Sequence, residues 1–360
     1  MRLKLCLSLL AGACAPRSGE PVGDGSTTGV TSVVVPSTGS PAETSGGSDA
    51  SSTGVLDDSG GSGSTTVRLD VGELPDGGDP QPAGCKGKID FLFVISRDGA
   101  MGQELEGYGT IHDRLVAAIP DFFSTIETKF ADFDYHILVT KGDPYWGGMN
   151  CNAECPGPFT EQCKAIDYPC DMVGKVSACD QTWGAGVVFN AGWLAPNKPC
   201  EIAGGKRYLA KGQPNLLETF ACVAQVGASG YYGVGQALAE AVSPELTGPG
   251  GCNEGFLRDD ALLVVTVITN TADVDSEGTP ASWAQAVFDA KGGDANAVVL
   301  FQVGVTLEYC ENPPWDNPLC ELLDQFPLRT AVYSWDKDYG PGFEAATDLI
   351  LDACASFVPG

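Results

Sequence analysis

A run of alternating acids is the first group of side chains in this sequence that could do chemistry. It reads DVDSEG over residues 273–278, with a glycine sixth, as loops that bind Ca²⁺ do. A calcium loop of this kind ends in a bidentate glutamate, and Ala284 stands at that position. Two interpretations stay open: a solvated acidic loop, and a Ca²⁺ ion held near Asp273 and Asp275. We assign no resident metal and no other cofactor.

Residues suited to catalysis are few. The only histidines are His112, in a predicted helix, and His136, at the start of a predicted strand, and we expect both to be structural. The nucleophile elbow GxSxG is absent, since Ser229 lies in GASGY, and neither HExxH nor a phosphate-binding glycine loop occurs. We therefore expect no catalytic residues and no enzyme activity. A secreted hydrolase that uses two of the 47 acidic residues is the third hypothesis.

The 14 cysteines indicate an oxidising compartment, because no tight CxxC pair or Cys/His cluster suggests a metal site. Twelve of them are expected to form disulfides whose pairing the sequence leaves open. These are Cys85, Cys151, Cys155, Cys163, Cys170, Cys179, Cys200, Cys222, Cys252, Cys310, Cys320 and Cys354.

The net charge of −27 argues against a nucleic-acid partner, because 20 basic residues among 47 acids are unlikely to form the positive surface that phosphates require. Attraction of the folded chain to anionic lipid is excluded on the same ground. The acidity is typical of a soluble extracellular surface, or of one that recognises a cation or a basic partner.

Residues 1–14 have the pattern of an export signal. Arg2 and Lys4 precede a short apolar run, and small residues follow it directly before Cys14. This ending resembles the bacterial lipobox, in which the cysteine is acylated and becomes the new N-terminus. Cleavage before Cys14 leaves twelve cysteines for disulfides, whereas ordinary cleavage after Ala13 with an unlipidated Cys14 leaves thirteen. We therefore predict a lipid-anchored protein of the outer membrane or cell surface, with soluble secretion as the alternative.

The remaining sequence divides into a linker and one domain. Residues 15–84 are rich in Ser, Thr, Gly and Pro and are predicted to be disordered. Apolar runs then predict strands at 89–95, 136–140, 261–268, 298–303 and 330–333, and helical periodicity predicts helices at about 115–130, 234–242, 283–290 and 343–357. Pro120 should kink or split the first helix. Strand and helix in alternation predict an α/β domain over 85–360, with a doubly wound, mostly parallel sheet.

The alternation breaks at about 143–213, where a loop-rich insertion holds six of the cysteines. Loops of this length are uncommon without cross-links. We expect the cysteines to supply them.

The stretch from Asp90 to Met101, with its apolar strand and the turn Ser96-Arg97-Asp98-Gly99-Ala100, resembles the first strand and metal loop of von Willebrand factor type A (VWA) domains. That loop reads D-x-S-x-S in the family. Three later stretches are similar: 220–229 before a helix, the strand 262–268 with its acidic run, and 335–343 before the last helix. The resemblance covers about 86–357 and is closest to cysteine-rich VWA lipoproteins of bacteria.

The resemblance implies a ligand site where strand ends meet helix starts, which the family equips with Mg²⁺. The matching positions are Ser96 for its first Asp, Asp98 and Ala100 for its two Ser, Ala228 or Ser229 for its Thr, and Thr269 for its later Asp. Only Asp98 is a carboxylate, and it stands where the family has a hydroxyl. Mg²⁺ sites commonly use one or two carboxylates, and both positions where the family has Asp have lost theirs. The resemblance therefore implies a degenerate metal site and a binding role that does not depend on metal.

The function expected from these features is protein binding or adhesion by a membrane-anchored extracytoplasmic domain, with an unidentified protein or envelope ligand as partner. A glycan-binding surface protein is the alternative, because Trp146, Trp183 and Trp193 lie in or near the insertion and could stack on sugars.

Overall fold

The computed structural model describes residues 85, 87–130, 132–148, 168–228, 230–311, 313 and 316–357. Several sequence predictions fall outside these residues: the leader with Cys14, the linker 15–84, Ser229, and the cysteines Cys151, Cys155 and Cys163. None of the helices in the described ranges has both the length and the apolar character needed to span a lipid bilayer.

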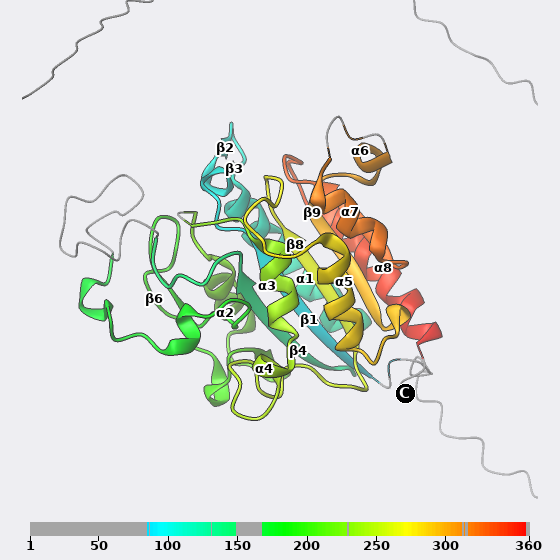
Figure 1. Cartoon of the computed structure of the whole chain (residues 1–360), viewed down its shortest axis with the longest axis horizontal. Helices are drawn as coiled ribbons and strands as arrows, with labels where there is room; N and C mark the ends of the chain where they lie inside the picture. Colours follow the sequence, from blue (N-terminus) through cyan, green and yellow to red (C-terminus); the bar gives the residue numbers. More distant parts are fainter. Residues whose placement is uncertain are drawn as a thin grey trace, which may run out of the picture. The chain divides into compact units, whose positions relative to one another are not determined.

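A mostly parallel sheet of six strands forms the centre of the domain, so the predicted α/β class with a mostly parallel sheet is confirmed (Figure 1). The strands are β1 (Lys88–Ile95), β4 (Asp134–Lys141), β7 (Leu209–Ala210), β8 (Leu262–Ile268), β9 (Val298–Gly304) and β10 (Arg329–Tyr333). They lie in the order β10-β9-β8-β1-β4-β7, and only β7 is antiparallel to its neighbour.

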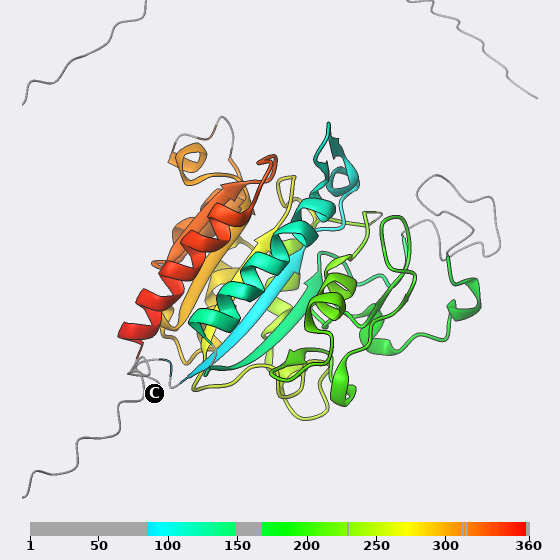
Figure 2. The ribbon, with the colours of Figure 1, turned by 180° about the vertical axis from the view of Figure 1, so that it is seen from behind.

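Helices pack on both faces of this sheet because its central strands are apolar on both sides. Phe91 and Phe93 of β1 contribute to the core under α1 (Ile111–Lys129), α2 (Leu216–Ala224) and α8 (Gly340–Ser356). Leu92 and Val94 contribute to the core under α3 (Val234–Ala241), α5 (Pro280–Asp289) and α7 (Pro318–Gln325). Figure 1 shows α3 and α5 in front of the sheet, and Figure 2 shows α1 and α8 from behind.

Helix α1 runs through Pro120 as one helix, so of the two predicted outcomes, a kink or a split, the split is wrong. Pro120 lies on the exposed side, where water can reach the carbonyl that the missing N–H leaves unpaired. The helix begins with a capping box, in which the Thr110 hydroxyl accepts from the Asp113 N–H at 3.1 Å and Asp113 accepts from the Thr110 N–H at 2.8 Å.

The shorter elements lie in the connections. They are the strand pairs β2 (Glu104–Leu105) with β3 (Gly109–Thr110) and β5 (Phe189–Asn190) with β6 (Lys198–Pro199), the helices α4 (Pro244–Thr247) and α6 (Leu307–Glu311), and the 3₁₀ turns η1 (Gly99–Gly102), η2 (Cys170–Met172), η3 (Ala178–Gln181), η4 (Ala203–Gly205) and η5 (Ala295–Ala297). The described part of the insertion contains β5, β6, three of the turns and the edge strand β7.

Four disulfides connect the described cysteines: Cys85–Cys354, Cys179–Cys252, Cys200–Cys222 and Cys310–Cys320. Cys170 is also disulfide-bonded. Two of the four join the insertion to segments that follow it in the chain. The insertion is therefore covalently attached to the rest of the domain at two places.

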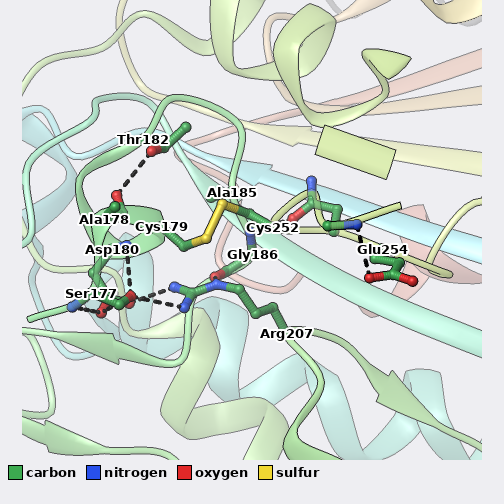
Figure 3. The surroundings of a disulfide bond; sticks show 12 residues. Ser177, Ala178, Cys179, Asp180, Thr182, Ala185, Gly186, Arg207, Cys252 and Glu254 are labelled. Carbon is green, nitrogen blue, oxygen red and sulfur yellow. Dashed lines mark hydrogen bonds and ion pairs between the residues drawn. A yellow bond between two sulfur atoms is a disulfide. The ribbon is translucent and has the colours of Figure 1, made fainter. Parts of the chain in front are cut away.

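Figure 3 shows how polar contacts reinforce one of these attachments, Cys179–Cys252. Arg207 donates from Nε to the Gly186 carbonyl oxygen at 2.7 Å and pairs through a second nitrogen with Asp180. Asp180 in turn caps its own turn by accepting from the Ser177 N–H at 3.0 Å. The disulfide thus lies beside a network of hydrogen bonds that orders residues 177–186.

Candidate functional site

The carboxyl ends of β1 and β8 lie side by side in the middle of the sheet. The Ser96 N–H donates to the Ile268 carbonyl oxygen at 2.8 Å, and on the other flank the Gly142 N–H donates to the Ile95 carbonyl oxygen at 3.0 Å. From β1 the chain adds β4 and β7 on one side of the sheet and then β8, β9 and β10 on the other. The connections therefore run in opposite directions on the two sides of β1. Open α/β sheets bind ligands at such switch points.

The first predicted positions fold into a turn that bonds to itself. The Asp98 N–H donates to the Ser96 hydroxyl at 3.2 Å, and the Asp98 carboxylate accepts from the Ala100 N–H at 2.7 Å. This second bond caps the 3₁₀ turn η1. Ser96 is fully buried, while Asp98 and Ala100 are partly exposed.

The later predicted positions add no charge to this turn. Ala228 is buried beside it: a Cβ built on Gly99 would lie 4.0 Å from the Ala228 carbonyl oxygen. Thr269 directly follows β8 and is fully buried, but its hydroxyl donates to the Thr271 carbonyl oxygen at 3.0 Å. Among the predicted positions that the structure describes, Asp98 carries the one carboxylate.

The acidic run after β8 contacts the start of helix α3. Asp273 accepts from the Gly235 N–H at 2.6 Å and from the Ser276 hydroxyl at 2.7 Å, and Asp275 accepts from the Tyr232 N–H at 3.3 Å. Burial raises the pKa of Asp273, and these hydrogen bonds oppose the rise. Asp273 therefore accepts an N–H of the first turn of α3, and Asp275 accepts an N–H of the loop before that helix. Within the described ranges no three His, Cys, Asp or Glu side chains form a metal-binding group.

A buried ion pair that the sequence analysis missed connects the switch point to the insertion. Arg97 and Asp143 are both fully buried, and Nη1 of Arg97 lies 3.0 Å from Asp143 Oδ1. The guanidinium also donates to the Tyr145 carbonyl oxygen at 2.7 Å and the Ala191 carbonyl oxygen at 3.2 Å. A Cβ on Gly230 would lie 1.8 Å from Asp143 Oδ2. The chain can therefore pass this close to the Asp143 carboxylate only with a glycine at position 230.

Both histidines are held inside the domain. His112 is buried at the start of α1, where neither ring nitrogen has a hydrogen-bond partner among the described residues, and burial lowers its pKa to about 4. His136 has its Nδ1 at 2.8 Å from the Phe256 carbonyl oxygen, and burial lowers its pKa as well. No hydrogen bond within the described residues joins either ring to a serine hydroxyl.

A cavity of about 700 Å³ opens at the carboxyl ends of β8, β9 and β10, next to the switch point. Thr269 is the one predicted site residue in its wall, which also includes Asn270, Thr271, Tyr333 and Trp335. Sequence reasoning missed this cavity. The available signal was that three lining segments, 269–272, 304–306 and 333–336, directly follow or end predicted strands.

Exposed apolar side chains lie along the same edge of the sheet, one for each of its five parallel strands. Six large hydrophobic side chains are exposed among the described residues, and five of them lie where a parallel strand ends or in the segment that follows it. These five are Tyr108 after β1, Tyr145 after β4, Val274 after β8, Leu307 after β9 and Tyr333 at the end of β10. The sixth is Leu217, in the first turn of α2.

No protein-family model matches this chain, and no curated protein matches it. Among solved structures, the chain is similar to proximal thread matrix protein 1 from the mussel byssus. The sequence identity is 12% and the TM-score is 0.34, and the match covers 75% of this chain and 47% of that one.

Proposed function

We propose that this chain is an exported binding protein whose VWA-like, doubly wound domain recognises a partner protein at the carboxyl edge of its sheet, without a resident divalent metal. In this proposal the lipid on Cys14 anchors the protein to the outer membrane or cell surface, and residues 15–84 act as the tether.

The five exposed side chains at the carboxyl edge are the observation that carries this proposal. Exposed large hydrophobics are scattered singly on an ordinary soluble surface, whereas a concentration on one face is typical of an interaction site. Three of the five are tyrosines, a residue type that is enriched where protein surfaces bind each other.

The sheet topology supports the doubly wound part of the proposal. Numbered along the chain, its strands read 3-2-1-4-5-6 from the β7 edge, an order found in α/β folds that bind ligands at the switch point. The VWA-like loop 96–100 lies at that switch point.

The composition of this loop supports recognition without metal. Ser96 and Thr269 stand where the resemblance implies Asp, and Ala100 stands where it implies Ser. The one carboxylate, on Asp98, already accepts a backbone N–H. Mg²⁺ gives up its waters reluctantly, so a single carboxylate would hold it weakly.

The test is capture of a partner from bacterial envelope extract by the full chain with its disulfides formed. We expect the same protein to be retained in EDTA and in excess Mg²⁺, and Asp98→Ala to leave it bound. Tyr145→Arg and Val274→Arg should release it, while the matched control Leu217→Arg, remote from the edge, should not. A partner that requires Mg²⁺, survives both edge variants or is never captured would contradict the proposal.

The anchor is tested separately by Cys14→Ser. The lipid supplies the hydrophobic attachment in this proposal, so the variant should leave the membrane fraction. Wild-type protein recovered wholly in the soluble fraction after export would refute the anchor and leave the binding proposal standing.

Glycan binding remains the second candidate function. The cavity beside the switch point favours it, because its wall combines aromatic rings with uncharged polar groups.

A further inference from the structure

The cavity at the ends of β8, β9 and β10 has the size and position of a small-ligand site. Its volume of about 700 Å³ lies within the usual range of small-molecule pockets, about 300–1,000 Å³. Three strand ends and the start of α7 contribute to its wall, so elements of the sheet hold most of it in place. It is a separate feature from the turn 96–100 discussed above.

One part of the wall is aromatic, and its tryptophan is held in place. The guanidinium carbon of Arg114 lies 5.8 Å from the ring centre of Trp335. Arg114 is itself fixed, because it donates to the Ser334 carbonyl oxygen at 2.8 Å and approaches the Tyr339 hydroxyl at 3.4 Å. Tyr333 is 47% exposed. Rings of this kind bind a ligand that presents an apolar face.

Another part of the wall is polar but uncharged, and it contains a hydroxyl without a partner. The Thr271 Oγ1 atom is buried and makes no hydrogen bond in the described protein. Leaving a buried polar group unpaired is unfavourable, because the group loses its hydrogen bonds to water and gains none in return, so such groups call for an explanation.

A second unpaired group lies directly behind the cavity wall. The Gln302 side chain is fully buried, and neither its Oε1 nor its Nε2 has a partner. A Cβ placed on Gly304, which lines the cavity, would lie 3.6 Å from Gln302 Nε2.

The charges around the cavity limit the class of ligand that can bind. The protein carries a net charge of −27 and the exposed Asp336 lines the cavity, which disfavours anions. The Arg114 cation beside Trp335 disfavours a compact cation on that ring. A neutral ligand with an apolar face and several hydroxyls meets both conditions.

We propose that this cavity binds a neutral sugar ring, with its C–H face against Tyr333 or Trp335, and that the Thr271 side chain turns its buried hydroxyl toward the cavity to bond to a hydroxyl of the sugar. The site rests on the second candidate function, glycan binding, and it shares Tyr333 with the protein-binding edge. Free sugars and Thr271→Val probe the sugar site alone, so their failure would leave protein capture untouched, and failure of capture in the Tyr145 and Val274 tests would leave the sugar site standing.

The experiment is saturation-transfer NMR and calorimetry on the full, disulfide-bonded chain. The probes are glucose, galactose, mannose and N-acetylglucosamine, with glucuronate as the anionic comparator and choline as the cationic one. At least one neutral sugar should bind, and the charged comparators should bind more weakly or not at all.

Three variants locate the binding. Tyr333→Ala should weaken it about tenfold, which is about 1.4 kcal/mol, because it removes the ring on which the sugar stacks. Thr271→Val keeps the side-chain shape but removes the hydroxyl, and should weaken it about fivefold, whereas a purely structural role would leave affinity unchanged. Tyr145→Ala, a tyrosine of similar exposure at 41%, should leave it unchanged.

Any of three results would overturn the proposal. One is that no neutral sugar of the panel binds. Another is that choline or glucuronate binds more tightly than all of the sugars. The last is that a sugar binds equally well to Tyr333→Ala and Thr271→Val.

Discussion

The guanidinium of Arg97 donates to both carboxylate oxygens of Asp143, over 3.0 and 3.3 Å, and neither side chain is accessible to solvent. Arg97 lies two residues after the end of the central strand β1, and Asp143 lies two residues after the end of its neighbour β4. The pair therefore fixes the beginning of the insertion at the switch point of the sheet.

Removing one partner of this ion pair should be strongly destabilising, because the other charge is left buried and uncompensated. Arg97→Met should lower the free energy of unfolding by about 3–5 kcal/mol, measured by urea denaturation with the disulfides intact. The control is Arg329→Met, which breaks the exposed pair with Asp324 and should cost less than about 1 kcal/mol. Similar losses in both variants would show that the buried pair is not a special anchor.

The double variant Arg97→Met/Asp143→Asn should lose less stability than the two single variants added together. The asparagine can still accept from the Tyr145 N–H, which bonds to Asp143 at 2.9 Å, and no charge is left without a partner. Strict additivity in the same urea experiment would argue against coupling between these two residues.

Lys141 should make the stability of the fold rise with pH. Burial, and next the Arg97 charge, lower its pKa to about 7, while its ammonium bonds to the Asn190 side chain at 3.1 Å. Between pH 7 and 10.5 the unfolded chain holds a proton that the folded chain has lost, so stability increases with pH across that window, by up to about 1.4 kcal/mol per unit. The urea midpoint of the wild type should rise between pH 7 and 9.5, and Lys141→Met should make the midpoint nearly independent of pH over this range.

His112 should affect the stability of the fold below neutral pH. Its folded pKa of about 4 lies below the ordinary 6.5, so its contribution is complete above pH 6.5 and is lost as pH falls toward 4. His112→Phe should remove this loss and keep stability at pH 7, because no hydrogen bond of the ring is broken. The melting temperatures of the wild type and His112→Phe, measured from pH 7 to pH 4, test this prediction. If both fall by the same amount over this range, the prediction is contradicted.

The two disulfides Cys179–Cys252 and Cys310–Cys320 should contribute different amounts to the free energy of unfolding. Their cysteines are 73 and 10 residues apart. The loop-entropy relation then assigns them about 4 and about 3 kcal/mol respectively. Replacing both cysteines of one bridge with alanine in each variant, and comparing urea denaturation, should reproduce this order. A larger loss from Cys310→Ala/Cys320→Ala would show that strain or unfolded-state structure dominates.

The parts of the fold that the sequence predicted are those where local pattern and tertiary environment agree. β1 and β8 are mostly apolar because the sheet is covered on both faces, and the runs 89–95 and 261–268, interrupted only by Asp90 and Thr266, predicted that directly. β7 could not be predicted in this way, since it is two residues long and is a strand only because it pairs with His136 and Ile137 of β4.

The candidate site was predicted by position but not by its contacts. The turn at Ser96 and the acids at Asp273 do lie at the carboxyl edge, as strand ends must in a parallel sheet. That Arg97 would point into the insertion, or that Asp273 would cap α3, depends on partners 46 and 38 residues away. No spacing rule reaches that far. The cavity has the same origin, because its wall is assembled from three separate strand ends.

The Cys85–Cys354 disulfide joins two residues 269 positions apart, one before the first strand and one near the end of the last helix. A pulling force applied between the chain before Cys85 and the chain after Cys354 would therefore pass through one covalent bridge instead of through the sheet. The strands between them would carry no load from that direction. Force from a partner held at the carboxyl edge would still load the noncovalent fold, so the domain should resist tension between its ends far better than tension on its binding surface.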